Sequence, residues 1–321
     1  HEKTHRRPMT KRVCFIYNPM SGEKRARTHL DYIIKCYQNN GYAVEPFRIG
    51  RLQDMGQAIR RVTPDYDRIL VAGGDGTVNT VVNQMKLYGI DIPLAVLPTG
   101  TANDFAGLLG YSNNLKTAIK QSATGTVATV DLGKCGDSYF VNVLSGGLFT
   151  DISQKTPTVL KNTFGKLAYY MTSYINSIQE LPKFRSMHIS IDAEETRFDG
   201  MSVVFFVFNG RTAGNMKLAY RSDICDGLLD VIVVKGDNIG DTIRTVFHFL
   251  SQQITDINSD YPKGVLYFKT RKLTISGKEP ITVDIDGENG PATPVDISCI
   301  PDGLKVIVPT DNIETQHIPD R

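Results

Sequence analysis

The sequence predicts a two-domain protein, with an N-terminal α/β domain followed by a C-terminal all-β domain. Its 321 residues exceed what one ordinary hydrophobic core encloses. Over residues 1–128, short apolar runs alternate with helical patterns, which is typical of a doubly wound, mostly parallel sheet. Over residues 129–304, strand patterns follow one another with turn residues between them, which favours an antiparallel β-sandwich. We expect a cleft between the domains, and the chain end, 305–321, is a candidate to return to the first domain.

Each element of the first domain follows from apolar spacing and from the residues that end it. Helix patterns repeat apolar residues every three or four positions, and two of them end at Gly41 and Gly89. The predicted strands are 12–19, 43–49, 67–74 and 94–100, and the predicted helices are 24–42, 52–62, 77–89 and 101–110.

The second domain is predicted to consist mainly of strands. Alternating or continuous apolar runs occupy 138–149, 186–211, 227–236, 264–288 and 295–309. Two stretches there have helical spacing, 159–181 and 239–253. The sequence shows no internal repeat at a fixed period.

Composition limits the classes of function. The net charge of +2 gives no electrostatic signature of nucleic-acid binding, and we expect no such partner. The five cysteines form no C-x-x-C pair, which favours a reducing, cytoplasmic compartment without structural disulfides. No apolar run reaches the roughly 18 residues needed to span a bilayer. The basic N-terminal segment is either a solvated tail or a segment that is weakly attracted to an anionic membrane surface.

Three predicted strands of the first domain each end in a turn of small residues that opens a helix. In open α/β sheets, ligands bind beyond the carboxyl ends of such strands. Glycine lets the backbone approach a phosphate, and the amides at a helix N-terminus favour negative charge. The turns therefore predict a phosphate site. Its candidate residues are Asn18, Pro19, Ser21 and Gly22 in the first turn, Gly73, Gly74, Asp75, Gly76, Thr77 and Asn79 in the second, and Thr101, Asn103 and Asp104 in the third.

The second turn, GGDGT, is neither of the two common phosphate motifs. It lacks the lysine of a Walker A loop and the G-x-G-x-x-G spacing of a dinucleotide fingerprint. Asp75 would repel a phosphate unless a cation lay between them, which favours a magnesium-bound nucleoside triphosphate over NAD bound as a cofactor. A single glycine turn is commonly structural, but three such turns together favour the phosphate interpretation.

Taken together, GGDGTVN, PTGTANDF and the upstream YNPMSG resemble the catalytic domain of the diacylglycerol kinase and sphingosine kinase superfamily, most closely its soluble bacterial lipid-kinase branch. The segments VNVLSGGLF, FGKLAYY, DGLLDVIVV and VDIDGE continue the likeness in family order through nearly the whole chain. NAD kinases share the GGDGT turn and the fold, but neither the NDF segment nor this sandwich pattern. The resemblance implies an ATP-dependent and magnesium-dependent kinase acting on a lipid alcohol such as diacylglycerol.

The resemblance also implies roles for individual residues. The three turns would contact the nucleotide, and Asp75 would lie near the magnesium ion and the transferred phosphoryl group. In the DGE motif, Asp286 and Glu288 would be catalytic, with Glu288 accepting the proton of the lipid hydroxyl. The segment SDICDGLLD resembles the family's structural magnesium loop, in which the Asp226 side chain and the carbonyls of Asp223 and Leu228 would be ligands. A solvated hairpin residue at Glu288 and an ordinary tight turn at Asp226 remain the alternatives.

Three departures from the family pattern bear on activity, and one of them is that a threonine that commonly contacts nucleotide near the second strand is replaced around Arg48 and Ile49. Thr80 stands where the family usually has glutamate, and Gly107 where it usually has arginine. Because arginine can bind phosphate or carboxylate in a bidentate way, its absence leaves two alternatives open. The chain could be a lipid-binding protein on a decayed kinase fold, or a kinase of NAD or another soluble alcohol. For membrane contact the candidate is the segment 164–185, whose aromatic residues would otherwise be core. The sequence leaves a homodimer open.

Overall fold

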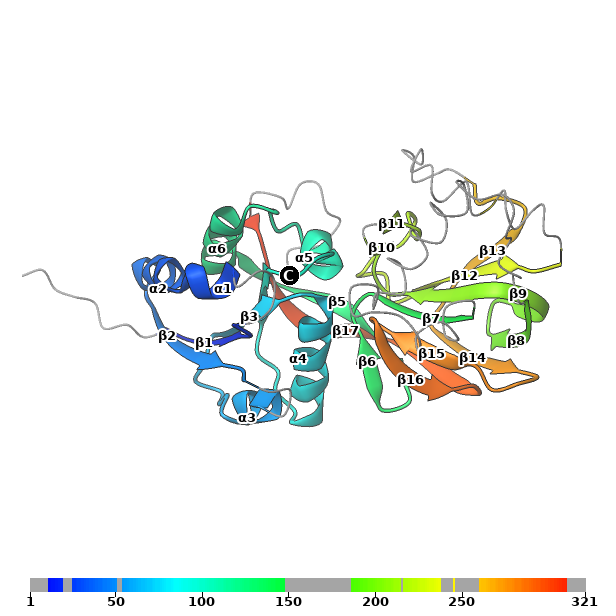
Figure 1. The fold of residues 1–321 in the computed structure, drawn as a ribbon, viewed down its shortest axis with the longest axis horizontal. Coiled ribbons are helices and arrows are strands. Elements are labelled where there is room, and N and C mark those ends of the chain that lie inside the picture. Colours follow the sequence, from blue (N-terminus) through cyan, green and yellow to red (C-terminus); the bar gives the residue numbers. More distant parts are fainter. Residues whose placement is uncertain are drawn as a thin grey trace, which may run out of the picture. The chain divides into compact units, whose positions relative to one another are not determined.

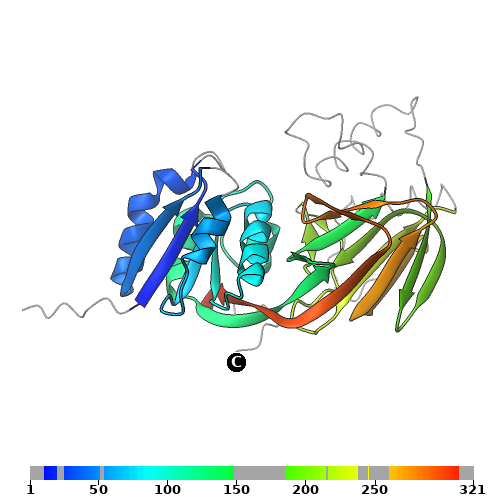
Figure 2. The same ribbon diagram turned by 90° about the horizontal axis from the view of Figure 1, so that it is seen from below.

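The computed structural model describes residues 11–19, 25–50, 54–147, 186–214, 216–237, 245 and 260–310. The chain divides into two compact units. One comprises residues up to Thr129 together with those from Leu304 onward, and the other comprises Val130–Gly303. Two strands, β5 (Thr126–Cys135) and β17 (Val295–Val308), contribute residues to both units (Figure 2).

The first unit is built on a parallel sheet with the strand order β17-β4-β3-β1-β2. Its order reverses at β1, because the chain runs from β1 outward to β2 and then back through β3 and β4. The strands are β1 (Lys11–Tyr17), β2 (Tyr42–Arg48), β3 (Arg68–Gly73) and β4 (Leu94–Pro98). The helices are α1 (Arg25–Thr28), α2 (Leu30–Asn39), α3 (Asp54–Arg60), α4 (Asp75–Leu87), α5 (Asp104–Leu108) and α6 (Leu115–Thr124).

Helices cover both faces of this sheet, with α2 and α6 in contact on one face and α3 and α4 in contact on the other (Figure 1). The central strands β3 and β4 are buried along their whole length, as expected of a parallel sheet between two helical layers. The end of β17 is fastened here, because the Tyr111 hydroxyl donates a 2.7 Å hydrogen bond to the Ile307 carbonyl.

The second unit is a β-sandwich whose pairings are antiparallel. The main path of pairing runs β16-β15-β7-β9-β8-β14-β17, with β12 joining β9 to β13, and β5 joining β17 to β6. A two-stranded sheet, β10 with β11, is separate. The remaining bounds are β6 (Ser138–Phe140), β7 (Val143–Gly147), β8 (Met187–Ala193), β9 (Arg197–Phe208), β10 (Thr212–Ala213), β11 (Met216–Lys217), β12 (Leu229–Lys235), β13 (Val265–Thr270), β14 (Lys272–Gly277), β15 (Thr282–Ile285) and β16 (Glu288–Ala292).

Strand β12 and the second part of β9, from Ser202 to Phe208, are buried on both faces, which explains their continuous apolar runs. In β9, Phe205 and Val207 enter one core cluster, while Phe206 and Phe208 enter the other. Successive side chains of a strand point to opposite faces, so each strand contributes to two cores in alternation. Asp230 interrupts the apolar run of β12 and is completely buried.

The predicted fold class is confirmed, since both the α/β unit and the β-sandwich are present. The sequence predicts no element over 111–125, where α6 forms. Its start signal is Asn114, whose side chain accepts a hydrogen bond from the Thr117 amide. The predicted helices 159–181 and 239–253 lie outside the described residues, except for Thr245, which is helical. None of the described helices combines the length and hydropathy that a bilayer crossing requires.

Candidate functional site

The second glycine turn joins the buried strand β3 to the helix α4. Gly74 is the N-cap of α4 in an extended conformation, and its carbonyl accepts hydrogen bonds from the amides of Thr77 (3.0 Å) and Val78 (3.1 Å). The aligned peptide dipoles of an α-helix leave partial positive charge at its N-terminus, which favours an anion beside Gly74. The turn therefore presents the positive end of a 13-residue helix.

The third turn, between β4 and α5, is held by one asparagine. Asn103 adopts a left-handed conformation with φ of 55°, which asparagine tolerates better than most residues. Its side chain accepts a 2.7 Å hydrogen bond from the Gly100 amide and donates a 2.9 Å bond to the Gly100 carbonyl. These bonds shape the third turn, and the predicted contact of Asn103 with a nucleotide remains a prediction.

The second and third turns touch each other through glycine backbone. A Cβ atom on Gly100 would lie 2.3 Å from the Gly74 Cα atom, a separation that no real contact allows. Next to this contact, the Asp75 carboxylate accepts a 3.0 Å hydrogen bond from the amide of Phe105, at the start of α5. The two turns therefore lie against each other and form one continuous surface. Glycine at positions 74 and 100 permits the close approach, and the Asp75 carboxylate links the two turns.

This contact predicts different outcomes for two glycine substitutions. Gly100→Ala should lower stability by about 1–3 kcal/mol, because the added methyl group forces the two turns apart. Gly107→Ala is the matched control, since a Cβ there meets no atom within 4 Å and α5 gains about 0.5–1 kcal/mol from the loss of a helical glycine. Thermal denaturation and nucleotide titration of both variants test this. Equal melting temperatures for the two variants would contradict it.

Asp75 has the electrostatics expected of a residue that faces a cation. Burial raises the pKa of Asp75, the Phe105 amide opposes this shift, and the nearby carboxylate of Asp104 reinforces it. Asp104 is itself buried. Two neighbouring carboxylates with restricted access to water favour a hard cation such as Mg²⁺, which prefers oxygen ligands.

The other predicted nucleotide residues differ in their surroundings. Asn18 and Pro19 follow β1, which pairs with β3, so the first turn neighbours the second at the same edge of the sheet. Ser21 and Gly22 lie outside the described residues. Thr101 is exposed, whereas Asn79 is buried and accepts a 3.1 Å hydrogen bond from Asn83 within α4.

Thr80 and Gly107, which depart from the family pattern, have different surroundings. The hydroxyl of Thr80 donates a 2.8 Å hydrogen bond to the Gly76 carbonyl, one helical turn back in α4. This bond fixes the Thr80 side chain against the first turn of α4, next to Asp75. Gly107 is exposed on α5, and nothing lies within 4 Å of the space that its Cβ would fill.

In the second unit, the DGE motif forms the tip of a hairpin between β15 and β16. Asp286 and Gly287 both have positive φ, 50° and 92°, as a tight two-residue hairpin turn requires. The Asp286 carboxylate accepts hydrogen bonds of 2.7–3.0 Å from three successive amides, those of Val141, Asn142 and Val143. Asp286 therefore anchors the hairpin to the start of β7.

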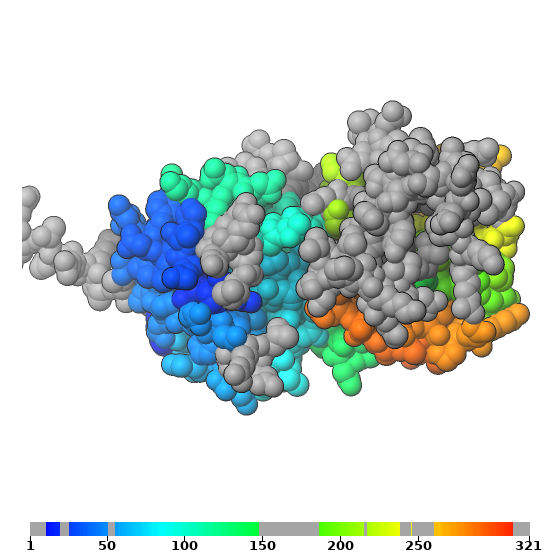
Figure 3. Space-filling model, viewed as in Figure 1, coloured from blue at the N-terminus to red at the C-terminus, as the bar shows by residue number. Residues whose placement is uncertain are grey.

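Glu288, by contrast, is exposed at the start of β16. Figure 3 shows the orange strands of this region at the molecular surface. An exposed carboxylate beside an anchored turn is accessible to a substrate hydroxyl group. The catalytic roles of Glu288 and Asp286 remain predictions.

The metal loop implied by the resemblance is held together by amides and carboxylates. Asp223 accepts a 3.0 Å bond from the Cys225 amide, and Asp226 accepts a 3.0 Å bond from the Leu228 amide through Oδ1. The other oxygen of Asp226 lies 2.6 Å from the ammonium group of Lys269. Within the described residues, no group of three or more His, Cys, Asp or Glu side chains is arranged to hold a metal ion. That absence concerns side chains alone, whereas the implied site would use one carboxylate, Asp226, and the backbone carbonyls of Asp223 and Leu228, so these three ligands remain predictions.

A carboxylate that sequence analysis missed organises the same loop. Asp131, near the boundary of the two units, is almost fully buried and accepts hydrogen bonds from the amides of Gly227 (2.6 Å) and Asp302 (3.0 Å). It joins the turn before β12 to the turn within β17. Only its position between the apolar residues Val130 and Leu132 could have indicated this role.

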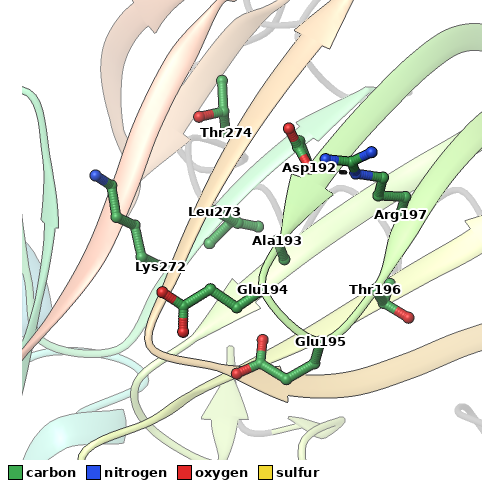
Figure 4. Close-up of a pocket in the computed structure, with 9 residues that line it drawn as sticks. All are labelled: Asp192, Ala193, Glu194, Glu195, Thr196, Arg197, Lys272, Leu273 and Thr274. Carbon is green, nitrogen blue, oxygen red and sulfur yellow. Dashed lines mark hydrogen bonds and ion pairs between the residues drawn. The ribbon is translucent and has the colours of Figure 1, made fainter.

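A shallow groove in the sandwich lies apart from all these residues. The turn between β8 and β9 and the neighbouring strand β14 form its walls, and an ion pair of 2.8 Å between Asp192 and Arg197 crosses its rim (Figure 4). Both partners of that pair are largely exposed. None of the predicted site residues lines the groove.

Comparison with known families decides the relationship. A model of the diacylglycerol kinase catalytic domain matches residues 12–135, and a model of the YegS C-terminal NAD kinase beta sandwich-like domain matches residues 144–308. The chain belongs to the diacylglycerol kinase family. The family to which the sequence motifs pointed is thereby confirmed.

Diacylglycerol kinases of Staphylococcus aureus, from strains bovine RF122 / ET3-1 and MRSA252, are each 31% identical over 316 residues, which cover 97% of this chain and 96% of each relative. A crystal structure from Bacillus anthracis str. Sterne superimposes with a TM-score of 0.81 at 24% identity, covering 97% of this chain and 99% of its own. Another, of a diacylglycerol kinase from that organism, gives 0.75 at 22% identity, covering 94% and 98%. The catalytic-domain match and the curated relatives support a lipid kinase, and the structures share its fold.

Proposed function

We propose that this diacylglycerol kinase family member transfers the γ-phosphoryl group of ATP to the hydroxyl group of a lipid alcohol such as diacylglycerol, with magnesium bound to the nucleotide. The observation that carries the proposal is the pair of joined turns in the first unit. Two glycine turns meet at Gly74 and Gly100, and Asp75 is linked to the start of α5 beside them. Backbone amides and a carboxylate side by side suit phosphates accompanied by a divalent cation.

In this proposal the residues divide the work of phosphoryl transfer. The amides that follow Gly74 hold the phosphates, and the Asp75 carboxylate positions the cation. The lipid hydroxyl oxygen forms a bond to the γ-phosphorus while the bond from that phosphorus to the bridging oxygen breaks, so that ADP leaves. Glu288 accepts the proton that the hydroxyl group gives up. Bound magnesium neutralises charge on the phosphate oxygens.

The experiment that tests the proposal offers several acceptors to the purified protein in parallel. Labelled ATP and magnesium are incubated with vesicles containing diacylglycerol, a sphingoid base or ceramide, and separately with NAD, and the products are resolved by thin-layer chromatography. We expect label in a phosphorylated lipid and none in NADP. Label in NADP alone would replace this proposal with a kinase of a soluble alcohol. Nucleotide binding without any labelled product would support the lipid-binding protein on a decayed kinase fold.

The same assay tests access to the membrane. We propose that the protein contacts the bilayer surface transiently, through the segment 164–185, which lies outside the described residues. Its basic residues include Lys183 and Arg185. Phosphorylation should then be faster on anionic than on neutral vesicles at equal acceptor content, and the difference should shrink as salt is added. Equal rates on both kinds of vesicle would exclude an electrostatic contribution to this contact.

A further inference from the structure

Strands β12 and β13 place a lysine directly opposite a buried aspartate. Their antiparallel register pairs Asp230 with Lys269. Residues that face each other in this way have neighbouring side chains on one face of the sheet. The Lys269 ammonium nitrogen lies 3.8 Å from Asp230 Oδ2 and 2.6 Å from Asp226 Oδ2. Lys269 thus bridges a carboxylate in the strand and a carboxylate in the preceding turn.

The buried aspartate needs such a cation. The Asp230 side chain is completely buried, and its Oδ2 atom accepts no hydrogen bond from the residues that the structure describes. Oδ1 accepts a 2.6 Å hydrogen bond from the hydroxyl of Tyr267, two residues before Lys269 on the same face of β13. A buried carboxylate without a compensating charge is strongly destabilising. The Lys269 side chain is 25% exposed, so its ammonium group is held partly away from water beside the two carboxylates.

We propose that the ammonium group of Lys269 supplies at this turn the positive charge that a metal ion supplies in the magnesium loop that the motif resembles. The turn 223–228 and the carboxylates of Asp226 and Asp230 are then stable without a divalent cation. The hydrogen bonds agree with this assignment, because the turn directs the amides of Cys225, Gly227 and Leu228 toward carboxylates. A lysine fixed by strand pairing also needs no ion from solution, so the stability of this unit does not depend on magnesium.

The test compares melting temperatures in excess magnesium and in EDTA, without nucleotide or lipid. The wild-type melting temperature should be the same in both. Lys269→Met keeps the apolar stem and removes the charge, so its melting temperature in EDTA should fall by on the order of 10 °C, and magnesium should restore part of the loss. Lys272→Met is the matched control, because Lys272 lies on the neighbouring strand β14 and its ammonium group makes no ion pair within the described residues. It should melt like the wild type.

A double variant separates charge compensation from packing. Asp230→Asn combined with Lys269→Met removes the buried charge together with its partner and should recover most of the melting temperature lost in Lys269→Met alone. Where the single variant does not fold, the double variant is still expected to fold, and failure of both would overturn the proposal. The assay involves no phosphoryl transfer, so its result is independent of the proposed activity.

Two results would overturn the inference directly. One is a Lys269→Met protein as stable in EDTA as the wild type. The other is a wild-type melting temperature that rises with magnesium and ceases to do so in Asp226→Asn, which would place a metal ion at Asp226 after all. If magnesium raises the melting temperature of Asp226→Asn as much as that of the wild type, the ion binds at a site other than Asp226. The same titration in Asp75→Asn then tests whether that site is at Asp75.

Discussion

The Asp75→Asn variant is expected to fold, to bind nucleotide and to lose most of its phosphoryl transfer. The amide oxygen of asparagine can still accept the hydrogen bond from the Phe105 amide, so the link between the two glycine turns survives. What disappears is the negative charge that would hold a divalent cation beside the phosphates. We expect kcat to fall on the order of 10²–10³-fold, with a change in the magnesium dependence of the rate.

Asp75→Ala is the matched variant for the structural half of this role. This variant removes the charge and also the acceptor for the Phe105 amide. Its free energy of unfolding should therefore lie about 1 kcal/mol below that of Asp75→Asn. Denaturant unfolding and steady-state kinetics on both variants separate the two contributions. Near wild-type turnover in Asp75→Asn, with magnesium dependence unchanged, would refute the role in cation binding.

Replacing Glu288 with glutamine should slow the reaction without weakening nucleotide binding. Glutamine keeps the size of the side chain and most of its hydrogen-bonding capacity but cannot accept the hydroxyl proton. General-base catalysis typically contributes about 10²–10⁴-fold, and we expect a loss of kcat in that range with a nucleotide Kd close to that of the wild type. Because Glu288 is exposed on an anchored hairpin, the melting temperature should barely change.

Two controls accompany this measurement. Glu195→Gln changes another exposed glutamate, on the turn between β8 and β9, and should leave kcat unaltered. Asp286→Asn should instead lower the melting temperature, because the carboxylate of Asp286 accepts three backbone amides. If Glu288→Gln retains kcat within a few-fold of the wild type, the proton acceptor is another group.

The pattern of elements was predictable because it depends on short-range periodicity. The helical spacing of 77–89 and the apolar run of 67–74 correspond to α4 and β3, with α4 beginning two residues earlier than predicted, at Asp75. That difference has a physical reason, since GGDGT supplies its own N-cap at Gly74 and the aspartate enters the first helical turn. The helix α6 was missed because its apolar face is short and its start depends on a side-chain cap at Asn114.

The candidate site was predictable in part. The glycine turns were recognisable, since glycine at a strand end that opens a helix has a local conformational reason. The partners of the acidic residues were not. Asp75 bonds to an amide 30 residues away and Asp286 to amides about 145 residues away, and no local pattern encodes either pairing. For Asp286 the structure adds a structural role, because its carboxylate accepts three backbone amides, and its catalytic role stays a prediction.

The sequence by itself determined the fold class, the family and the three turns that predict a phosphate site, because periodicity, turn chemistry and motif order are properties of neighbouring residues. The tertiary structure decided which groups meet. Gly100 touches Gly74 because β3 and β4 are adjacent parallel strands, and Lys269 faces Asp230 because of the register of β12 and β13. Strand order and register arise from the packing of whole apolar faces in each core. A lysine and an aspartate 39 positions apart therefore become an ion pair only once the sheet has formed.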